Sequence, residues 1–188
     1  MELEHLAFKL FIAPPPEATV AALVPVFHSW ITAGSAEELL IDVADYRHVP
    51  EGPGVVLIGF RADYSLDHCG GRWGIRYYRK APLAGGNLDR LLHSARATLN
   101  ACRRLQADSR LSGGIRLDGH EFEIQVCDRL LAPNNTSEQQ EFTAELAPFL
   151  ERFLRGGPYR LTYDNDPRSL LAARVTSEQI FELDHSLS

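Results

Sequence analysis

Residues 39–60 read LLIDVADYRHVPEGPGVVLIGF, and residues 72–80 read RWGIRYYRK. These stretches contain three runs rich in strand-forming residues, and no helical periodicity separates them. The links between the runs carry Gly, Pro and Asp, which are typical of turns. Because short links of this kind join antiparallel strands, we expect an antiparallel meander formed by residues 39–45, 55–60 and 72–80.

Apolar residues at helical spacing predict three amphipathic helices, over residues 17–32, 87–106 and 137–155. Further strands are expected over residues 6–13, 115–117, 121–126, 159–163 and 171–175. The dipeptide Asp118-Gly119 predicts a tight hairpin, since both turn positions favour positive φ. The resulting order, β-α-βββ-α-ββ-α-ββ, predicts an α+β fold: a two-layer sandwich of a largely antiparallel sheet and three helices.

Two helical segments resemble each other, AALVPVFHSWI at residues 21–31 and AELAPFLERFL at 144–154. A proline inside a helix costs about 3 kcal/mol, so a proline at the same register in both suggests a duplicated β-α-β-β unit. The units would span residues 5–62 and 120–176, with residues 72–106 inserted between them. Independent origin of the two segments is the alternative. We expect one domain over residues 1–176 and a polar tail over 177–188.

The composition is that of an ordinary globular protein: 188 residues, of which 45% are hydrophobic, with a net charge of −6. This acidic balance argues against partners such as nucleic acids or anionic membranes. No apolar segment reaches the roughly 18 residues that span a bilayer, and the N-terminus lacks a signal-peptide pattern. The three cysteines, Cys69, Cys102 and Cys127, form no CxxC motif. Reduced thiols and a cytoplasmic location are therefore expected.

The motifs of common enzyme sites are absent from the sequence: there is no Walker loop, GxGxxG, GxSxG or HExxH. We expect no cofactor. Asp45 and His48 are weak catalytic candidates, because a carboxylate can orient a histidine ring and raise its basicity. Asp67, His68 and Cys69 are weak metal-ligand candidates, since adjacent residues seldom converge on one ion. The alternative for both groups is an ordinary solvated strand end.

Basic and aromatic side chains form a candidate binding surface on the third strand of the meander and beside it: Arg61, Arg76, Tyr78 and Lys80. Tyr and Arg are enriched in the energetic centres of protein interfaces. The alternative is a structural ladder of cross-strand Arg–Asp pairs. The run VVLIGF adds a second hint, because it is apolar at every position except Gly59. Its second face should therefore be covered by another part of this chain or by another chain.

The predicted element order between Glu17 and Arg155 resembles that of type III secretion chaperones, and the resemblance implies a small acidic adaptor that dimerises and holds client segments. We therefore expect a non-enzymatic, cytosolic, chaperone-like binding protein or a subunit of a larger assembly. Its partner would be another protein or a second copy of itself. The alternative is a small enzyme or ligand-binding domain that acts on an anionic small molecule through Asp45, His48 and nearby arginines.

Overall fold

The computed structural model describes residues 1–34 and 38–180. Its elements follow the order β1 (Leu6–Ile12), α1 (Glu17–Ala33), β2 (Leu40–Tyr46), β3 (Gly54–Gly59), β4 (Ala62–Asp67), the 3-10 helix η1 (Cys69–Gly71), β5 (Gly74–Arg79), α2 (Asn87–Ala107), the 3-10 helix η2 (Ser109–Leu111), β6 (Leu117–Val126), α3 (Thr136–Phe153), β7 (Tyr159–Tyr163) and β8 (Ala172–Ser177). The predicted α+β class is confirmed: within the described residues, three α-helices pack on one antiparallel sheet of eight strands.

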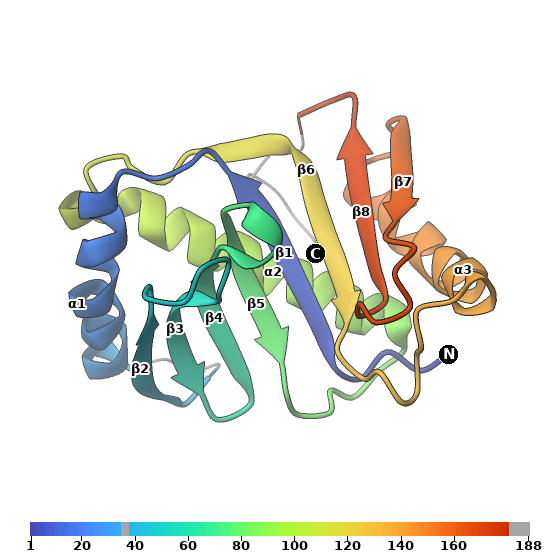
Figure 1. Cartoon of the computed structure of the whole chain (residues 1–188), viewed down its shortest axis with the longest axis horizontal. Coiled ribbons are helices and arrows are strands. Elements are labelled where there is room, and N and C mark those ends of the chain that lie inside the picture. The colour runs from blue at the N-terminus through green and yellow to red at the C-terminus, as the bar shows by residue number, and fades with distance from the viewer. Residues whose placement is uncertain (35–37, 181–188) are drawn as a thin grey trace.

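The sheet has the strand order β2-β3-β4-β5-β1-β6-β8-β7, and each neighbouring pair is antiparallel. Strand β1 therefore lies near the centre, between β5 and β6. Figure 1 shows α2 crossing behind the sheet, with α1 beside the β2 edge and α3 near the β7 edge. The opposite face, turned toward the viewer in Figure 1, carries no described α-helix, and we call it the open face.

The core lies between the helices and the sheet. In β1, alternate side chains enter this core, namely Leu6, Phe8, Leu10 and Ile12. The Phe8 ring stacks on Phe122 of β6 at 5.1 Å between centroids and meets the edge of Phe149 of α3 at 6.1 Å. Aromatic pairs of this kind add to the stabilisation that comes from buried area alone. They join the first strand of the chain to two much later elements.

No described helix has the length and apolar character needed to cross a bilayer.

One strand forms where the sequence predicted a turn. Strand β4 occupies Ala62–Asp67 and pairs with both β3 and β5. Its alternate residues Asp63, Ser65 and Asp67 lie on the open face, while Leu66 joins the core. The polar residues of this alternation are also typical of a loop, so the strand was not predicted from the sequence.

The hairpin predicted at Asp118-Gly119 does not form, because β6 is one continuous strand of ten residues. Only Gly119 has a positive φ, of 76°, whereas a two-residue hairpin of the predicted type needs positive φ at both positions. The irregularity is absorbed by a register shift between Leu10 and Ile12 of β1. In the described chain, four strands thus separate α1 from α2, and one separates α2 from α3. This distribution differs from the order on which the chaperone resemblance was based.

The two similar prolines lie inside helices, Pro25 in α1 and Pro148 in α3. The two helices that contain them have different neighbours: α1 packs beside β2 and β3, whereas α3 packs against α2. The duplication and the single-domain boundary at residue 176 stay predictions. Strand β8 extends through Ser177, and residues 181–188 of the expected tail lie outside the described residues.

Candidate functional site

Ion pairs cross-link much of the open face. Lys80 Nζ lies 2.7 Å from Asp63 Oδ1, and Arg72 Nη1 lies 2.6 Å from Glu121 Oε2. Arg174 pairs with Glu123 at 3.3 Å. These contacts join β4 to the end of β5, the start of β5 to β6, and β6 to β8. They link strands in the manner of the alternative ladder, but as Lys–Asp and Arg–Glu pairs rather than the Arg–Asp pairs named from the sequence.

Two of the predicted binding residues lie together on β5. The Arg76 guanidinium lies 5.4 Å from the centroid of the Tyr78 ring, and its Nη2 donates to Gln125 Oε1 at 3.1 Å. Arg61 lies apart from them, in the turn between β3 and β4, where its carbonyl accepts from the Lys80 amide. The Arg61 side chain is exposed and forms no ion pair with a described residue. Arg76 and Tyr78 therefore contact each other through their side chains, whereas Arg61 joins Lys80 through the backbone.

A buried ion pair lies at the centre of the open face. Lys9 Nζ is 2.5 Å from Asp67 Oδ2 and also donates to the Cys69 carbonyl at 3.0 Å. Lys9 is 4% exposed and Asp67 1%. The contact is an ion pair rather than an aligned hydrogen bond, since neither Asp67 oxygen has a hydrogen-bond partner of normal geometry. The Lys9 stem reaches Asp67 by passing over Gly74, where a Cβ would lie 2.7 Å from Lys9 Cγ and Cε.

The three weak metal-ligand candidates have separate surroundings. Asp67 pairs with Lys9, whereas the His68 ring stacks on Trp73 at 4.3 Å between centroids. Burial, reinforced by the Asp67 charge, raises the pKa of the Cys69 thiol to about 11. A thiol with this pKa is a poor metal ligand and nucleophile at neutral pH. Across residues 1–34 and 38–180, no group of three His, Cys, Asp or Glu side chains is arranged to hold a metal ion.

Asp45, the weak catalytic candidate, is bound to Arg47. Arg47 Nε donates to Asp45 Oδ1 at 2.8 Å, and Nη2 donates to Oδ2 at 2.6 Å. These hydrogen bonds lower the pKa of Asp45 to about 2, which makes its carboxylate a weak proton acceptor. His48 is exposed, with its ring 6.4 Å from that of Tyr46. Among the described contacts, no hydrogen bond joins Asp45 to His48.

A cleft of about 500 Å³ lies where the start of α1, the β2–β3 loop and the β4–β5 loop meet. We call it the loop cleft. Its apolar lining comes from Pro15, Val20, Val49, Pro50 and Trp73. Its charged and titratable lining comes from Glu17, Arg47, Glu51 and His68. The size and the mixture of an apolar wall with a few polar groups are typical of small-molecule sites.

Backbone geometry holds the walls of the loop cleft together. The His68 amide donates to the Gly52 carbonyl at 3.1 Å and so joins the two loops. Gly54 has a φ of 65°, and a Cβ there would lie 2.0 Å from the Leu66 carbonyl oxygen, so only glycine allows this close approach. The Trp73 ring is held by its stack with His68.

The loop cleft has a negative charge balance. Arg47 is offset by Asp45, whose hydrogen bonds raise the pKa of the guanidinium, and Glu17 adds a smaller electrostatic contribution. Glu17 and Glu51 are exposed and form no ion pair with a described residue. Within residues 1–34 and 38–180, these two carboxylates of the wall therefore have no cation bound in an ion pair. The cleft should attract a positively charged group more strongly than a negatively charged one.

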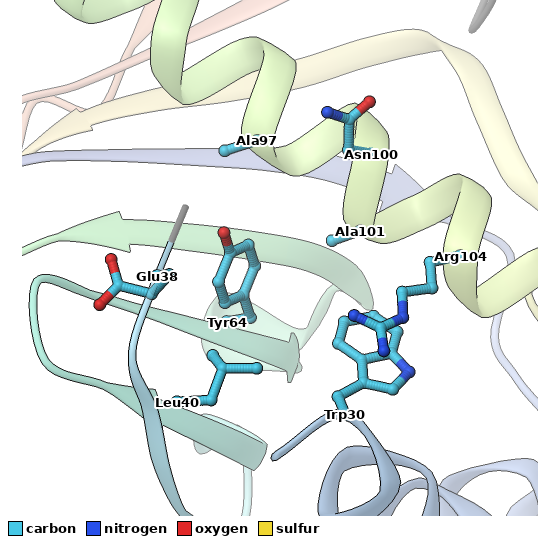
Figure 2. A pocket seen from close by; sticks show the side chains of 8 residues that line it. All are labelled: Trp30, Glu38, Leu40, Tyr64, Ala97, Asn100, Ala101 and Arg104. Carbon is cyan, nitrogen blue, oxygen red and sulfur yellow. The ribbon is translucent and has the colours of Figure 1, made fainter. Parts of the chain in front are cut away.

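A smaller cleft, of about 110 Å³, opens on the helix-covered face between α1, α2 and the sheet. Figure 2 shows the Arg104 guanidinium lying over the Trp30 ring, at 4.0 Å from its centroid, with Tyr64 and Leu40 on the sheet side. The Tyr64 ring meets the edge of Tyr77 at 5.2 Å. Desolvation lowers the pKa of Arg104. This volume is sufficient for a few water molecules rather than for an organic ligand of ordinary size.

Several cleft residues were missed by sequence reasoning, namely Glu17, Glu51, Trp30, Trp73 and Arg104. The chain has only two tryptophans, and each lines a cleft. The rarity of tryptophan was the one local signal in the sequence that could have identified Trp30 and Trp73 as cleft residues.

No protein-family model matches this chain, and no curated protein matches it either.

Proposed function

We propose that this protein is a non-enzymatic binding protein whose loop cleft takes a small organic cation with a flat apolar body. The observation that carries the proposal is the lining of the cleft: an apolar wall that includes Trp73, beside Glu17 and Glu51. An ammonium group is stabilised by carboxylates and by the face of an aromatic ring. The flat body would replace water against the apolar wall.

The sign of the ligand charge differs from the sequence-based alternative, which named an anion bound through Asp45, His48 and arginines. Arg47 is the arginine that lines the cleft, and its Nε and Nη2 already donate hydrogen bonds to Asp45. An anion would compete with Asp45 and approach two further carboxylates. Binding rather than catalysis is proposed because Asp45, the candidate base named from the sequence, has a pKa of about 2.

The test compares two probes with the same body and opposite charge, phenethylamine and 3-phenylpropionate. The two tryptophans give two indole N–H signals in a proton–nitrogen NMR spectrum, and Trp73→Phe assigns them. Phenethylamine should shift the Trp73 signal with saturation, while the Trp30 signal, which belongs to the smaller cleft, stays in place. Stronger binding of 3-phenylpropionate, or equal shifts of both signals, would contradict the proposal.

Charge-removing variants make the same test sharper. Each exposed carboxylate–ammonium contact is worth about 0.2–1 kcal/mol, so Glu17→Gln with Glu51→Gln should weaken phenethylamine binding by roughly 2- to 30-fold. Glu178→Gln is the matched control, because Glu178 is exposed and does not line the cleft. Unchanged affinity in the double variant would remove the electrostatic basis of the proposal.

A protein-binding adaptor is the second candidate function. It is favoured by two adjacent exposed leucines in the β6–α3 loop, Leu130 at 95% and Leu131 at 72% exposure. Native mass spectrometry of the protein from its own host should then detect a second polypeptide that Leu130→Ser with Leu131→Ser removes. A cytoplasmic location belongs to both proposals, since the three cysteines are free thiols.

A further inference from the structure

The open face carries an apolar region over β2 and β3, beside the ion pairs of the other strands. This strip consists of five side chains: Leu39, Ile41, Val56, Ile58 and Phe60. Three of them are widely exposed, Leu39 at 67%, Ile41 at 53% and Phe60 at 66%. Val56 and Ile58 are half-buried and alternate along β3 with Val55 and Leu57, which enter the core. The strip is the second apolar face that the VVLIGF run predicted.

Backbone pairing places the five side chains in one strip. The Phe60 amide donates to the Leu39 carbonyl at 2.8 Å, so these two residues are neighbours across the strand pair. The register of β2 against β3 shifts between Leu40 and Asp42. Because a bulge sets two residues against one, Ile41 lies beside Asp42, which faces Ile58. The strip therefore continues from one strand to the next.

One acid and one base accompany the strip. Asp42 and Arg61 are both exposed, and neither forms an ion pair with a described residue. By contrast, Lys80, Arg72 and Arg174 on the same face are all paired. Asp42 Oδ1 accepts from the Val43 amide at 2.8 Å, so this amide is already hydrogen-bonded. Pairing of β2 with a second β2 would also bring Asp42 and Asp45 of both chains together, which favours contact through the face rather than along the edge.

We infer that the strip is the interface of a homodimer in which Arg61 of each copy contacts the partner's Asp42. A twofold axis places a surface against itself, so each residue that contacts a second one is contacted by it in return. Because Asp42 and Arg61 form no ion pair within the described part of the chain, a strip that carries both is complementary to itself in this arrangement. The five apolar side chains of each copy would then be covered by those of the other.

The test is sedimentation of purified full-length protein over a range of concentrations. The wild type should associate reversibly to a dimer. Phe60→Asp should raise the dissociation constant at least tenfold, because it places a charge within the apolar contact. Leu130→Asp is the matched control, since Leu130 is equally apolar and even more exposed but belongs to a different loop. A monomer at all concentrations, or equal effects of the two substitutions, would overturn the inference.

Charge exchange gives a test that does not depend on apolar residues. Asp42→Arg places two arginines against each other at each contact, and Arg61→Asp places two aspartates there. Each variant alone should dimerise at least tenfold more weakly than the wild type. An equimolar mixture should form heterodimers, because every contact between position 42 of one chain and position 61 of the other then joins an arginine to an aspartate. Failure of the mixture to recover association would overturn the assigned contact, and circular dichroism checks that every variant is folded.

Discussion

The buried pair Lys9–Asp67 allows a quantitative test of the central part of the sheet. We consider Lys9→Met, which keeps the apolar stem over Gly74 but removes the ammonium group. Asp67 would then remain 1% exposed, with no cation in contact and neither oxygen in a hydrogen bond of normal geometry. Removing one partner of a buried ion pair typically costs about 3–5 kcal/mol, because the remaining charge stays desolvated.

The chain contains a matched control in the pair Lys80–Asp63, which has nearly the same distance, 2.7 Å against 2.5 Å, but is partly exposed. Partly exposed pairs of this kind contribute about 0.2–1 kcal/mol. Lys80→Met should therefore cost several-fold less than Lys9→Met. For a domain of this length, 3–5 kcal/mol corresponds to a decrease of roughly 6–20 °C in melting temperature.

Urea unfolding followed by tryptophan fluorescence measures the free energies of unfolding. Asp67→Asn is expected to destabilise the protein as well. The double variant Lys9→Met with Asp67→Asn strands no charge, so its cost should fall below the sum of the two single costs by about 1–3 kcal/mol. The reasoning would be refuted if Lys9→Met cost no more than Lys80→Met, or if the two single costs were simply additive.

Three further predictions concern Gly74, Asp45 and Cys69. Gly74→Ala should destabilise the fold in thermal unfolding, because the new Cβ would lie 2.7 Å from the Lys9 stem and 2.8 Å from the Leu10 carbonyl oxygen. The control is Gly70→Ala, which measures backbone strain alone, since Gly70 has a positive φ and open space around it. An equal loss of stability in the two variants would contradict the steric explanation. The pKa of Asp45 is lowered from 3.8 to about 2, so its pairing with Arg47 stabilises the folded state above pH 3.8, and this stabilisation is lost as the pH falls through about 2. A carboxyl NMR titration should find a midpoint of about 2 for Asp45 in the wild type and a midpoint closer to 3.8 in Arg47→Gln. A wild-type midpoint near 3.8 would exclude the pairing. Burial and, to a smaller extent, the Asp67 charge raise the pKa of Cys69 to about 11, so iodoacetamide should modify this thiol slowly at pH 8. The reaction should be faster in Asp67→Asn, and peptide mapping measures its rate. Equal rates in the two proteins would show that the Asp67 charge has no influence on the thiol.

Local patterns were sufficient for the helices but not for every strand. The predicted helix over residues 17–32 corresponds to Glu17–Ala33, because the apolar residues that repeat at helical spacing are the ones buried in the structure. Strand β4 was missed because Asp63 and Asp67 find cationic partners on other elements, Lys80 and Lys9. Charges that are paired across strands look like loop residues when only one strand is read.

The candidate site could be predicted only in part. The sequence pointed to the region around Asp45 and His48, and the loop cleft does include the neighbouring Arg47. The pairing of Asp45 with Arg47 rather than His48 depends on side-chain reach at the end of β2, which spacing does not specify. Glu17 and Trp73 come from segments more than fifty residues apart, so only the tertiary fold brings them to one wall.

The central position of β1 has a consequence for how the chain reaches this fold. Strands β2 to β5 can pair in sequence order as soon as they are made, but β1 needs β5 on one side and β6 on the other. Pairings this distant in sequence slow folding, because a long loop must close before any contact forms. During synthesis the apolar run LAFKLFI therefore leaves the ribosome long before its second neighbour exists. The charge of Lys9 in the middle of that run opposes aggregation in this interval, before Asp67 neutralises it in the finished sheet.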